Sequence, residues 1–148
     1  VTIWNECEEA FERFQEGDEE VRVKSGEVEA TFRVSAVGPV GVRLKELEIR
    51  REGGFDVVEE AERLGRAVRS LGAELSPIEV DRGLGGAILR SPADAKRPNE
   101  FFEMDCEQRG KTRLRRLKSL QEGGREVIDF AMTREQLGRL VEEVSDSE

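Results

Sequence analysis

The sequence predicts an α+β fold, with one mainly antiparallel sheet and helices packed on a single face of it. Most segments with a clear hydrophobic pattern alternate apolar and polar residues, which is typical of strands with one buried and one wet face. Only three segments show helical spacing instead. Turn signals separate the strands at short intervals, and a hairpin sheet with few helices packs most economically with those helices on one side.

The first segment is expected to be an acidic amphipathic helix that ends near Gly17, with Thr2 as its N-cap. Its glutamates occupy the positions between the apolar ones, so the outer face of the helix carries strong negative charge. The residues at helical spacing are Ile3, Cys7, Ala10, Phe11 and Phe14.

Strands follow over 21–24, 28–36 and 40–49, and the segment 28–36 has the clearest alternation of the whole chain. In the third strand the apolar phase changes, because a step of three residues separates Leu44 from Leu47. Such a step inside a period of two predicts a β-bulge. Gly53-Gly54 ends this strand, and an apolar stripe from Val57 to Leu71 predicts a second helix that stops at Gly72.

The second half is expected to hold strands over 78–80, 87–89, 102–106, 112–120 and 127–132. The glycines of 83–86 favour a hairpin turn over a phosphate-binding loop, since no Lys-Ser/Thr pair follows them. Residues 91–100 contain two prolines and are expected to form the longest loop. Thr133 and Gln136 make a capping box at the start of a last helix.

Two parts of the chain resemble each other. Residues 43–58 and 113–128 align at a constant offset of 70, and seven of these 16 positions are identical. The helices that follow align once three residues are added to the second copy. This predicts a duplicated bulged hairpin–helix unit, with pseudo-repeats at about 28–72 and 100–144 related by a pseudo-twofold axis. The alternative is coincidence in a chain rich in arginine, glutamate, leucine and glycine.

Composition restricts the classes of function. The chain has 148 residues, which is the usual size of one domain, so we expect a single domain over 1–148. Histidine and tyrosine are absent, which removes the commonest general base and the commonest metal ligand and makes an enzyme less expected than a binding protein. The sequence predicts no metal site and no cofactor. Cys7 and Cys106 lie on apolar phases of their segments and are expected to be reduced and buried.

No apolar run reaches the length of a membrane span, and no signal-peptide pattern opens the chain, so we expect a protein of the cytoplasm that does not enter a membrane. The sequence begins with Val1 and leaves open whether a leader has been removed. Its net charge of −9 disfavours non-specific binding to nucleic acid.

A basic segment stands out against this acidic background, with six basic residues among the ten of 109–118. Strand alternation places its first four basic residues on one face. Leu114 and Leu117 repeat the three-residue step of Leu44 and Leu47, and a bulge after Arg115 would keep the last two basic residues on the same face. The expected partner-binding residues are therefore Arg109, Lys111, Arg113, Arg115, Arg116 and Lys118. The alternative is an ordinary charged strand face that is balanced by acidic residues of the neighbouring strands.

The sequence favours a small non-catalytic protein–protein interaction or adaptor protein that uses an open sheet face and associates with another protein or with itself. One alternative is a nucleic-acid-binding protein that uses the basic strand, although this strand lacks the interleaved aromatic residues on which bases stack. A less favoured alternative is a histidine-free enzyme that acts through carboxylates. The sequence identifies no ligand, partner or pathway.

Overall fold

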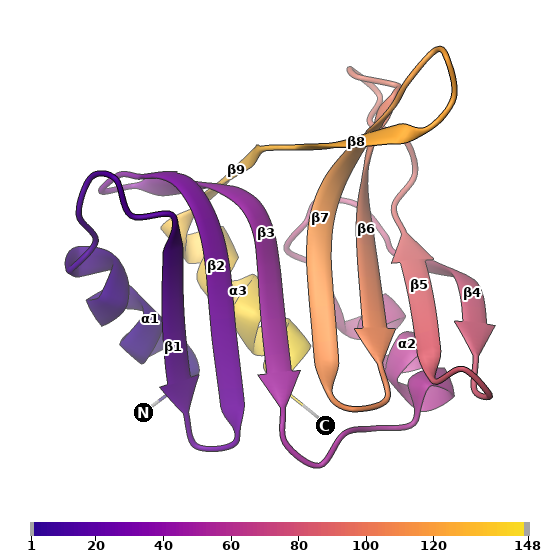
Figure 1. Ribbon diagram of the computed structural model, residues 1–148, viewed down its shortest axis with the longest axis horizontal. Helices are drawn as coiled ribbons and strands as arrows, with labels where there is room; N and C mark the ends of the chain where they lie inside the picture. The colour runs from indigo at the N-terminus through magenta and orange to yellow at the C-terminus, as the bar shows by residue number, and fades with distance from the viewer. Residues whose placement is uncertain (1, 147–148) are drawn as a thin grey trace.

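The computed structural model describes residues 2–146 as one open antiparallel sheet of nine strands with three helices. Figure 1 shows the sheet in front and the helices behind it. The helices are α1 (Ile3–Glu12), α2 (Val57–Ala67) and α3 (Arg134–Ser145). The strands of the first half are β1 (Glu20–Ser25), β2 (Val28–Val37) and β3 (Gly41–Arg51). Those of the second half are β4 (Ser76–Asp81), β5 (Gly86–Arg90), β6 (Glu100–Glu107), β7 (Lys111–Ser119), β8 (Arg125–Ile128) and β9 (Phe130–Thr133).

The main path of the sheet runs β1-β2-β3-β7-β6-β5-β4, so the two halves of the chain meet at β3 and β7. These two strands pair only over a short ladder from Leu47↔Leu114 to Arg50↔Lys111. Beyond it they separate, and β9 pairs with β3 while β8 pairs with β7. The strand expected over 127–132 is therefore two strands that fill the gap at the top of the sheet (Figure 1).

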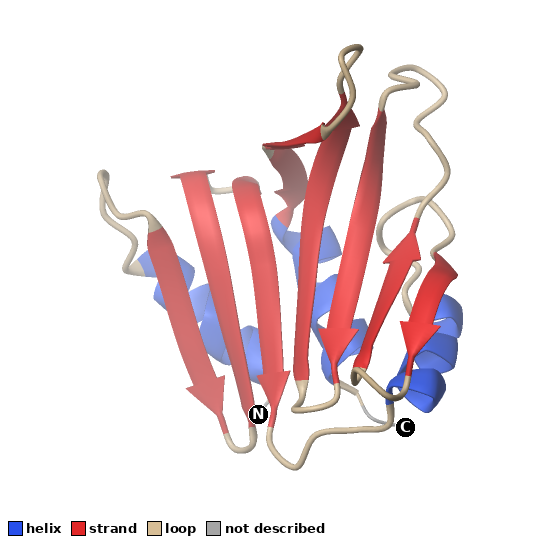
Figure 2. Ribbon diagram, turned by 45° about the vertical axis from the view of Figure 1, so that its right-hand side comes forward, coloured by secondary structure: helices blue, strands red, loops and turns tan. Residues whose placement is uncertain are grey.

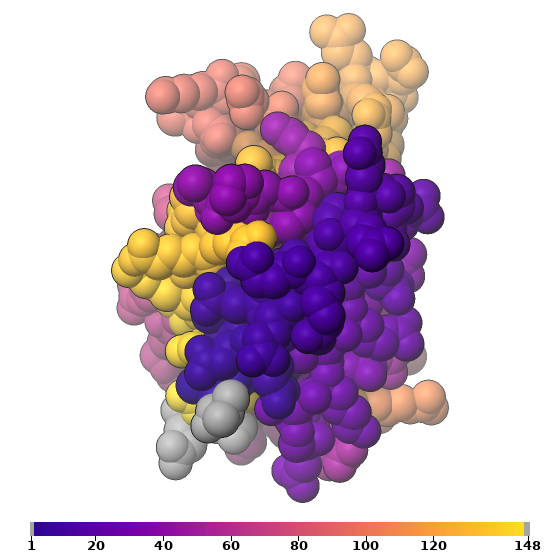
Figure 3. Space-filling model, turned by 90° about the vertical axis from the view of Figure 1, so that its left-hand side faces the viewer, coloured from indigo at the N-terminus to yellow at the C-terminus, as the bar shows by residue number. Residues whose placement is uncertain are grey.

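All three helices lie on one side of the sheet, as Figure 2 shows in blue, which confirms the expected α+β class. α1 and α3 pack against each other and against the half that contains β1–β3, and Figure 3 shows them side by side in indigo and yellow. α2 packs beneath β4, β5 and β6. The opposite side, which we call the open face, carries no helix among residues 2–146.

The core lies between the sheet and the helices. Both cysteines are free and buried there, as predicted. Burial raises the pKa of the Cys7 thiol to about 12, with smaller contributions from Glu6 and Glu8. Burial likewise raises the pKa of Cys106 to about 12, with a smaller contribution from the carboxylate of Glu60. Both thiols are therefore neutral members of the core, and neither is an activated nucleophile.

Side-chain caps fix the start of each helix. The N-cap of Thr2 and the capping box of Thr133 with Gln136 are confirmed, and Asp56 caps α2 by accepting the N–H of Glu59 at 3.1 Å. Two predicted ends are wrong, since α1 ends at Glu12 and α2 at Ala67. In α2 the reason is tertiary. Glu143 of α3 accepts the next two free backbone N–H groups, those of residues 69 and 70, so the chain leaves the helix there.

The predicted bulge exists in β3 but not in β7. Against β2, the neighbours Arg33 and Val34 face Glu46 and Leu44, so Lys45 is the extra residue of β3. The ladder between β6 and β7 runs without interruption from Glu100↔Lys118 to Glu107↔Lys111. Leu114 and Leu117 therefore point to opposite faces of the sheet.

The internal duplication is not confirmed. Its best support is that β3 and β7 occupy adjacent central positions and that each precedes a helix. After the Gly-Gly turn, however, the first copy enters α2 while the second forms β8. A twofold axis at the offset of 70 also requires that Leu44 pair with Leu117, just as Leu47 pairs with Leu114. Leu44 pairs with Phe130 instead.

Candidate interaction surface

The structure brings together three of the six basic residues predicted for partner binding. Lys111, Arg113 and Arg115 alternate with the buried Thr112 and Leu114, so they point to the open face. The other three lie elsewhere. The exposed Arg109 sits in the turn between β6 and β7, and the unbroken ladder places Arg116 and Lys118 on the opposite side of the strand.

Arg116 is the clearest correction, because its side chain is almost entirely buried. Its Nη2 lies 3.0 Å from Asp94 Oδ2, and its Nε lies 3.0 Å from Glu100 Oε1. Its guanidinium also stands 4.7 Å above the centre of the Phe102 ring. Arg116 therefore ties the loop 91–99 to the sheet and is not available to a partner.

On the open face the basic residues of β7 are flanked by acidic residues of both neighbouring strands. Arg113 lies 3.0 Å from Asp105 of β6 and 3.9 Å from Glu46 of β3. Lys111 lies 3.7 Å from each of two carboxylates, those of Glu48 and Glu107. The predicted basic stripe is thus one row of an alternating pattern in which acidic strands border a basic strand.

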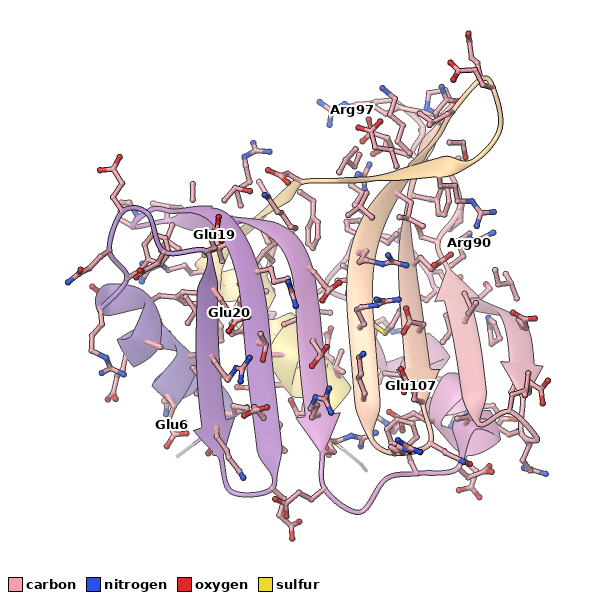
Figure 4. All side chains as sticks on the ribbon, viewed as in Figure 1. Glu6, Glu19, Glu20, Arg90, Arg97 and Glu107 are labelled. Carbon is pink, nitrogen blue, oxygen red and sulfur yellow. The ribbon has the colours of Figure 1, made fainter. Side chains whose placement is uncertain are left out.

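The same pattern continues across the first half of the sheet. Arg33 of β2 pairs with Glu46 at 3.5 Å, and Arg50 pairs with Glu48 at 2.9 Å. Figure 4 shows charged side chains distributed over this face, with Glu20, Arg90 and Glu107 labelled at β1, β5 and β6. The charges of the open face largely cancel, so most of the net charge of −9 arises elsewhere, above all on α1.

Glu103 of β6 is the centre of a group of charged side chains on the open face, at the end of the sheet near β8. Its carboxylate lies 2.7 Å from Arg90, 3.6 Å from Arg115 and 4.0 Å from Arg125, and its side chain is largely buried by them. Alternation with Met104 indicated that Glu103 points away from the core. The sequence did not indicate that three arginines would surround it, because they come from three other strands, β5, β7 and β8.

A small apolar cluster lies beside Glu103, outside the main core. Phe101 and Leu117 are opposite each other in the ladder and are both buried, although they belong to the open face. The guanidinium groups of Arg90 and Arg125 cover the Phe101 ring at 5.0 and 5.6 Å from its centre. Arginine stacked on an aromatic ring is a composition typical of interface centres.

Two arginines of the stripe have unusual surroundings. Burial on its own lowers the pKa of Arg113, but the carboxylates of Asp105, Glu46 and Glu103 outweigh it and raise the pKa above the ordinary value. The Nε of Arg115 is buried and has no hydrogen-bond partner among the described residues. Arg115 is therefore held less completely than Arg113 and has a donor left for a further acceptor.

Within residues 2–146, no cluster of cysteine and carboxylate side chains is placed to bind a metal ion. No helix in the same range is long and apolar enough to cross a membrane. Comparison with protein-family models, with curated proteins and with solved structures finds no match for this chain.

Proposed function

We propose that this protein is a non-catalytic interaction module that binds another protein through the open face of its sheet. The observation that carries the proposal is the arrangement of that face. Helices cover the other side of the sheet, whereas the open face carries alternating rows of charged side chains on at least four adjacent strands, β2, β3, β7 and β6. Patterns of this kind select partners by electrostatic complementarity.

The geometry favours a protein partner over nucleic acid. A phosphate backbone requires basic side chains that are free to replace its counterions. Lys111, Arg113 and Arg115 are each within 4 Å of a carboxylate, and a phosphate would have to displace it. A protein surface can instead contribute charges of both signs and meet the existing rows without breaking them. The cluster around Phe101 would lie at the centre of such a contact.

The open face can be tested by neutralising its charges without changing the net charge. Converting Arg33, Glu46, Glu48 and Arg50 to glutamine removes two acidic and two basic residues from the same region. The fold should survive, because partly exposed ion pairs contribute only about 0–1 kcal/mol each. Sedimentation velocity measures self-association, and capture from a lysate at low salt measures binding of other proteins. We expect the fourfold variant to self-associate less, or to capture fewer proteins from the lysate, than the native protein does.

The matched control is Glu135→Gln with Arg139→Gln on α3, which removes an exposed ion pair from the helix side of the molecule. It should leave both measurements unchanged. A separate variant, Arg115→Gln, tests the basic strand alone. If the fourfold variant sediments as the native protein does and captures the same proteins, the open face is only a solvated surface and the proposal is wrong.

A further inference from the structure

The strand β4 forms the edge of the sheet opposite to β1, and it differs from every other strand in its exposure. All six of its residues are exposed, including Ile78 at 50% and Val80 at 40%. Leu84, in the turn that follows, is 87% exposed. Three of the six large apolar side chains that are exposed in residues 2–146 thus lie within 78–84. No strand pairs with the outer edge of β4 in the part of the chain that the structure describes.

The side of β4 that belongs to the open face is acidic. Glu79 lies opposite Ile88 of β5, and Ile88 lies opposite Asp105 of β6. In the next row, Asp81 lies opposite Gly86, and Gly86 lies opposite Glu107. Two carboxylates of the edge strand therefore face two carboxylates of β6 across β5, which contributes no charge in either row.

A hollow of about 210 Å³ lies between these carboxylates. Gly86 has no side chain to fill it, and Ile88 and Leu84 supply apolar surface. Asp105 and Glu107 are paired with Arg113 and Lys111 on their far side. Glu79 and Asp81 take part in no ion pair among the described residues. The rim of the hollow therefore keeps an excess of negative charge.

The hollow fits one long basic side chain. Its volume is below the roughly 300–1,000 Å³ of sites for small molecules. Its four carboxylates do not form a cluster that could bind a metal ion. Arginine or lysine combines an apolar stem, which would lie on Ile88, with a charged end group that would reach the carboxylates.

We propose that the edge of β4 binds an extended segment of a partner protein in which basic and apolar residues alternate. The segment adds a strand to the sheet, and its backbone binds the free N–H and C=O groups of β4. Because neighbouring side chains of a strand point to opposite faces, its basic residues meet Glu79, Asp81 and the hollow. Its apolar residues lie on the helix side beside Val80, which shares that side with the buried Ala87.

Charge argues against a second copy of this chain as the occupant. When β4 pairs antiparallel with itself about a twofold axis at Glu79, the two copies of Glu79 lie opposite each other. When the axis lies at Val80, Glu79 of one copy lies opposite Asp81 of the other. Like charges directly opposite in a ladder destabilise the pairing, whereas a basic strand removes the repulsion.

The test uses a peptide of about eight residues with alternating arginine and valine and blocked ends, roughly the length of a strand. Binding is followed by amide chemical shifts of the whole protein. We expect shifts at 78–81, 86–88 and 105–107. A peptide of the same composition with all arginines first, and an alternating peptide with every second amide N-methylated, should both bind much more weakly. The first has the wrong side-chain alternation and the second lacks backbone donors.

Glu79→Lys should weaken binding of the alternating peptide by about fivefold or more, because it reverses a charge at the rim of the hollow. Glu9→Lys on α1 makes the same change at another exposed position and should alter affinity by less than about twofold. The open-face variant described above should bind the peptide normally, since it lies outside the edge strand, so the two proposals fail separately.

Two results would overturn the inference. Equal binding of the peptide with all arginines first, with shifts centred on α1, would mean non-specific attraction to an acidic protein. Shifts over 76–81 that depend on protein concentration in the absence of peptide would mean that the occupant is a second copy.

Discussion

The two edge strands of the sheet have opposite surroundings. In β1 the apolar residues Val21 and Val23 are buried beneath α1, and the charged residues between them face outward. In β4 the apolar residues are exposed although α2 packs nearby. An edge strand invites pairing with another chain unless it is covered or charged. A helix thus buries the apolar side chains of one edge strand, whereas those of the other edge strand stay exposed.

The cause lies in the helices beneath each half. Two helices, α1 and α3, support the half with β1, whereas α2 alone supports the half with β4. Glu60 of α2 forms ion pairs with Arg51 of β3 and with Arg63 of its own helix, and so joins α2 to the centre of the sheet. Arg63 in turn donates to the carbonyls of residues 143 and 144 at the end of α3. These bonds tie α2 to β3 and α3, and α2 also packs against β4 and β5, yet it does not bury the side chains of β4.

The largest expected difference between the edges comes from placing a carboxylate on each. Val23→Asp buries a charge beneath α1 and should lower the free energy of unfolding by about 3 kcal/mol or more. Val80→Asp should change it by only about 0.5 kcal/mol, since the side chain reaches water. Urea titration of both variants measures these values. Similar losses would contradict the picture of one covered and one accessible edge.

A smaller difference is expected at two glycines that are equivalent in the near-repeat. In α3, a Cβ at Gly138 would lie 2.6 Å from Nε1 of Trp4, so Gly138→Ala must push α1 away and should destabilise by about 1–3 kcal/mol. In α2, a Cβ at Gly65 would meet only the carbonyl oxygen of Leu75, at 3.4 Å. Gly65→Ala should be neutral or stabilising by up to about 1 kcal/mol through helix propensity. Thermal unfolding compares the two.

The thiols of the two halves should respond to pH alike. The folded pKa of Cys7 and of Cys106 is raised to about 12, above the roughly 8.5 of an unfolded cysteine. Each buried neutral thiol therefore makes its full contribution to the free energy of unfolding below about pH 8.5. That contribution is lost as pH rises toward 12, because the thiol ionises more readily in the unfolded chain. Between these limits each thiol contributes a fall of up to about 1.4 kcal/mol per pH unit.

Cys7→Ala and Cys106→Ala should each remove one such contribution from the slope of unfolding free energy against pH. The cavity left by the substitution lowers stability at every pH and does not affect the slope. Denaturant titrations between pH 8 and 10.5 give the slopes. A slope unchanged from that of the native protein would mean that the thiol concerned is not buried in solution.

The smallest effect is expected in how often the backbone hydrogen bonds of each edge strand open locally. Backbone amides of β4 should exchange with solvent faster than those of β1, because every side chain of β4 is exposed whereas Val21 and Val23 of β1 are buried. Hydrogen exchange followed residue by residue measures the difference. Equal protection of both edges would indicate that β4 is already covered, for instance by a second copy.

Local signals in the sequence were sufficient for most elements. Alternation located the strands, the side chains of Thr2 and Thr133 located two helix starts, and the apolar phase of Cys7 and Cys106 predicted their burial. The step from Leu44 to Leu47 predicted the bulge in β3 correctly. These signals succeed because they depend on neighbours in the chain, whose geometry is fixed by the backbone.

The candidate sites depended on tertiary structure. The same three-residue step in β7 produces no bulge, because β6 pairs with β7 without interruption and thereby turns Arg116 into the interior. Whether Arg113 is a free cation or a paired one depends on Asp105 of the adjacent strand β6 and on Glu46 of β3, which comes from the first half of the chain. The sequence by itself determined which residues alternate and where helices begin. The tertiary structure decided which strands are neighbours, and hence which charges are paired and which edge remains accessible, because strand pairing joins residues that no local pattern relates.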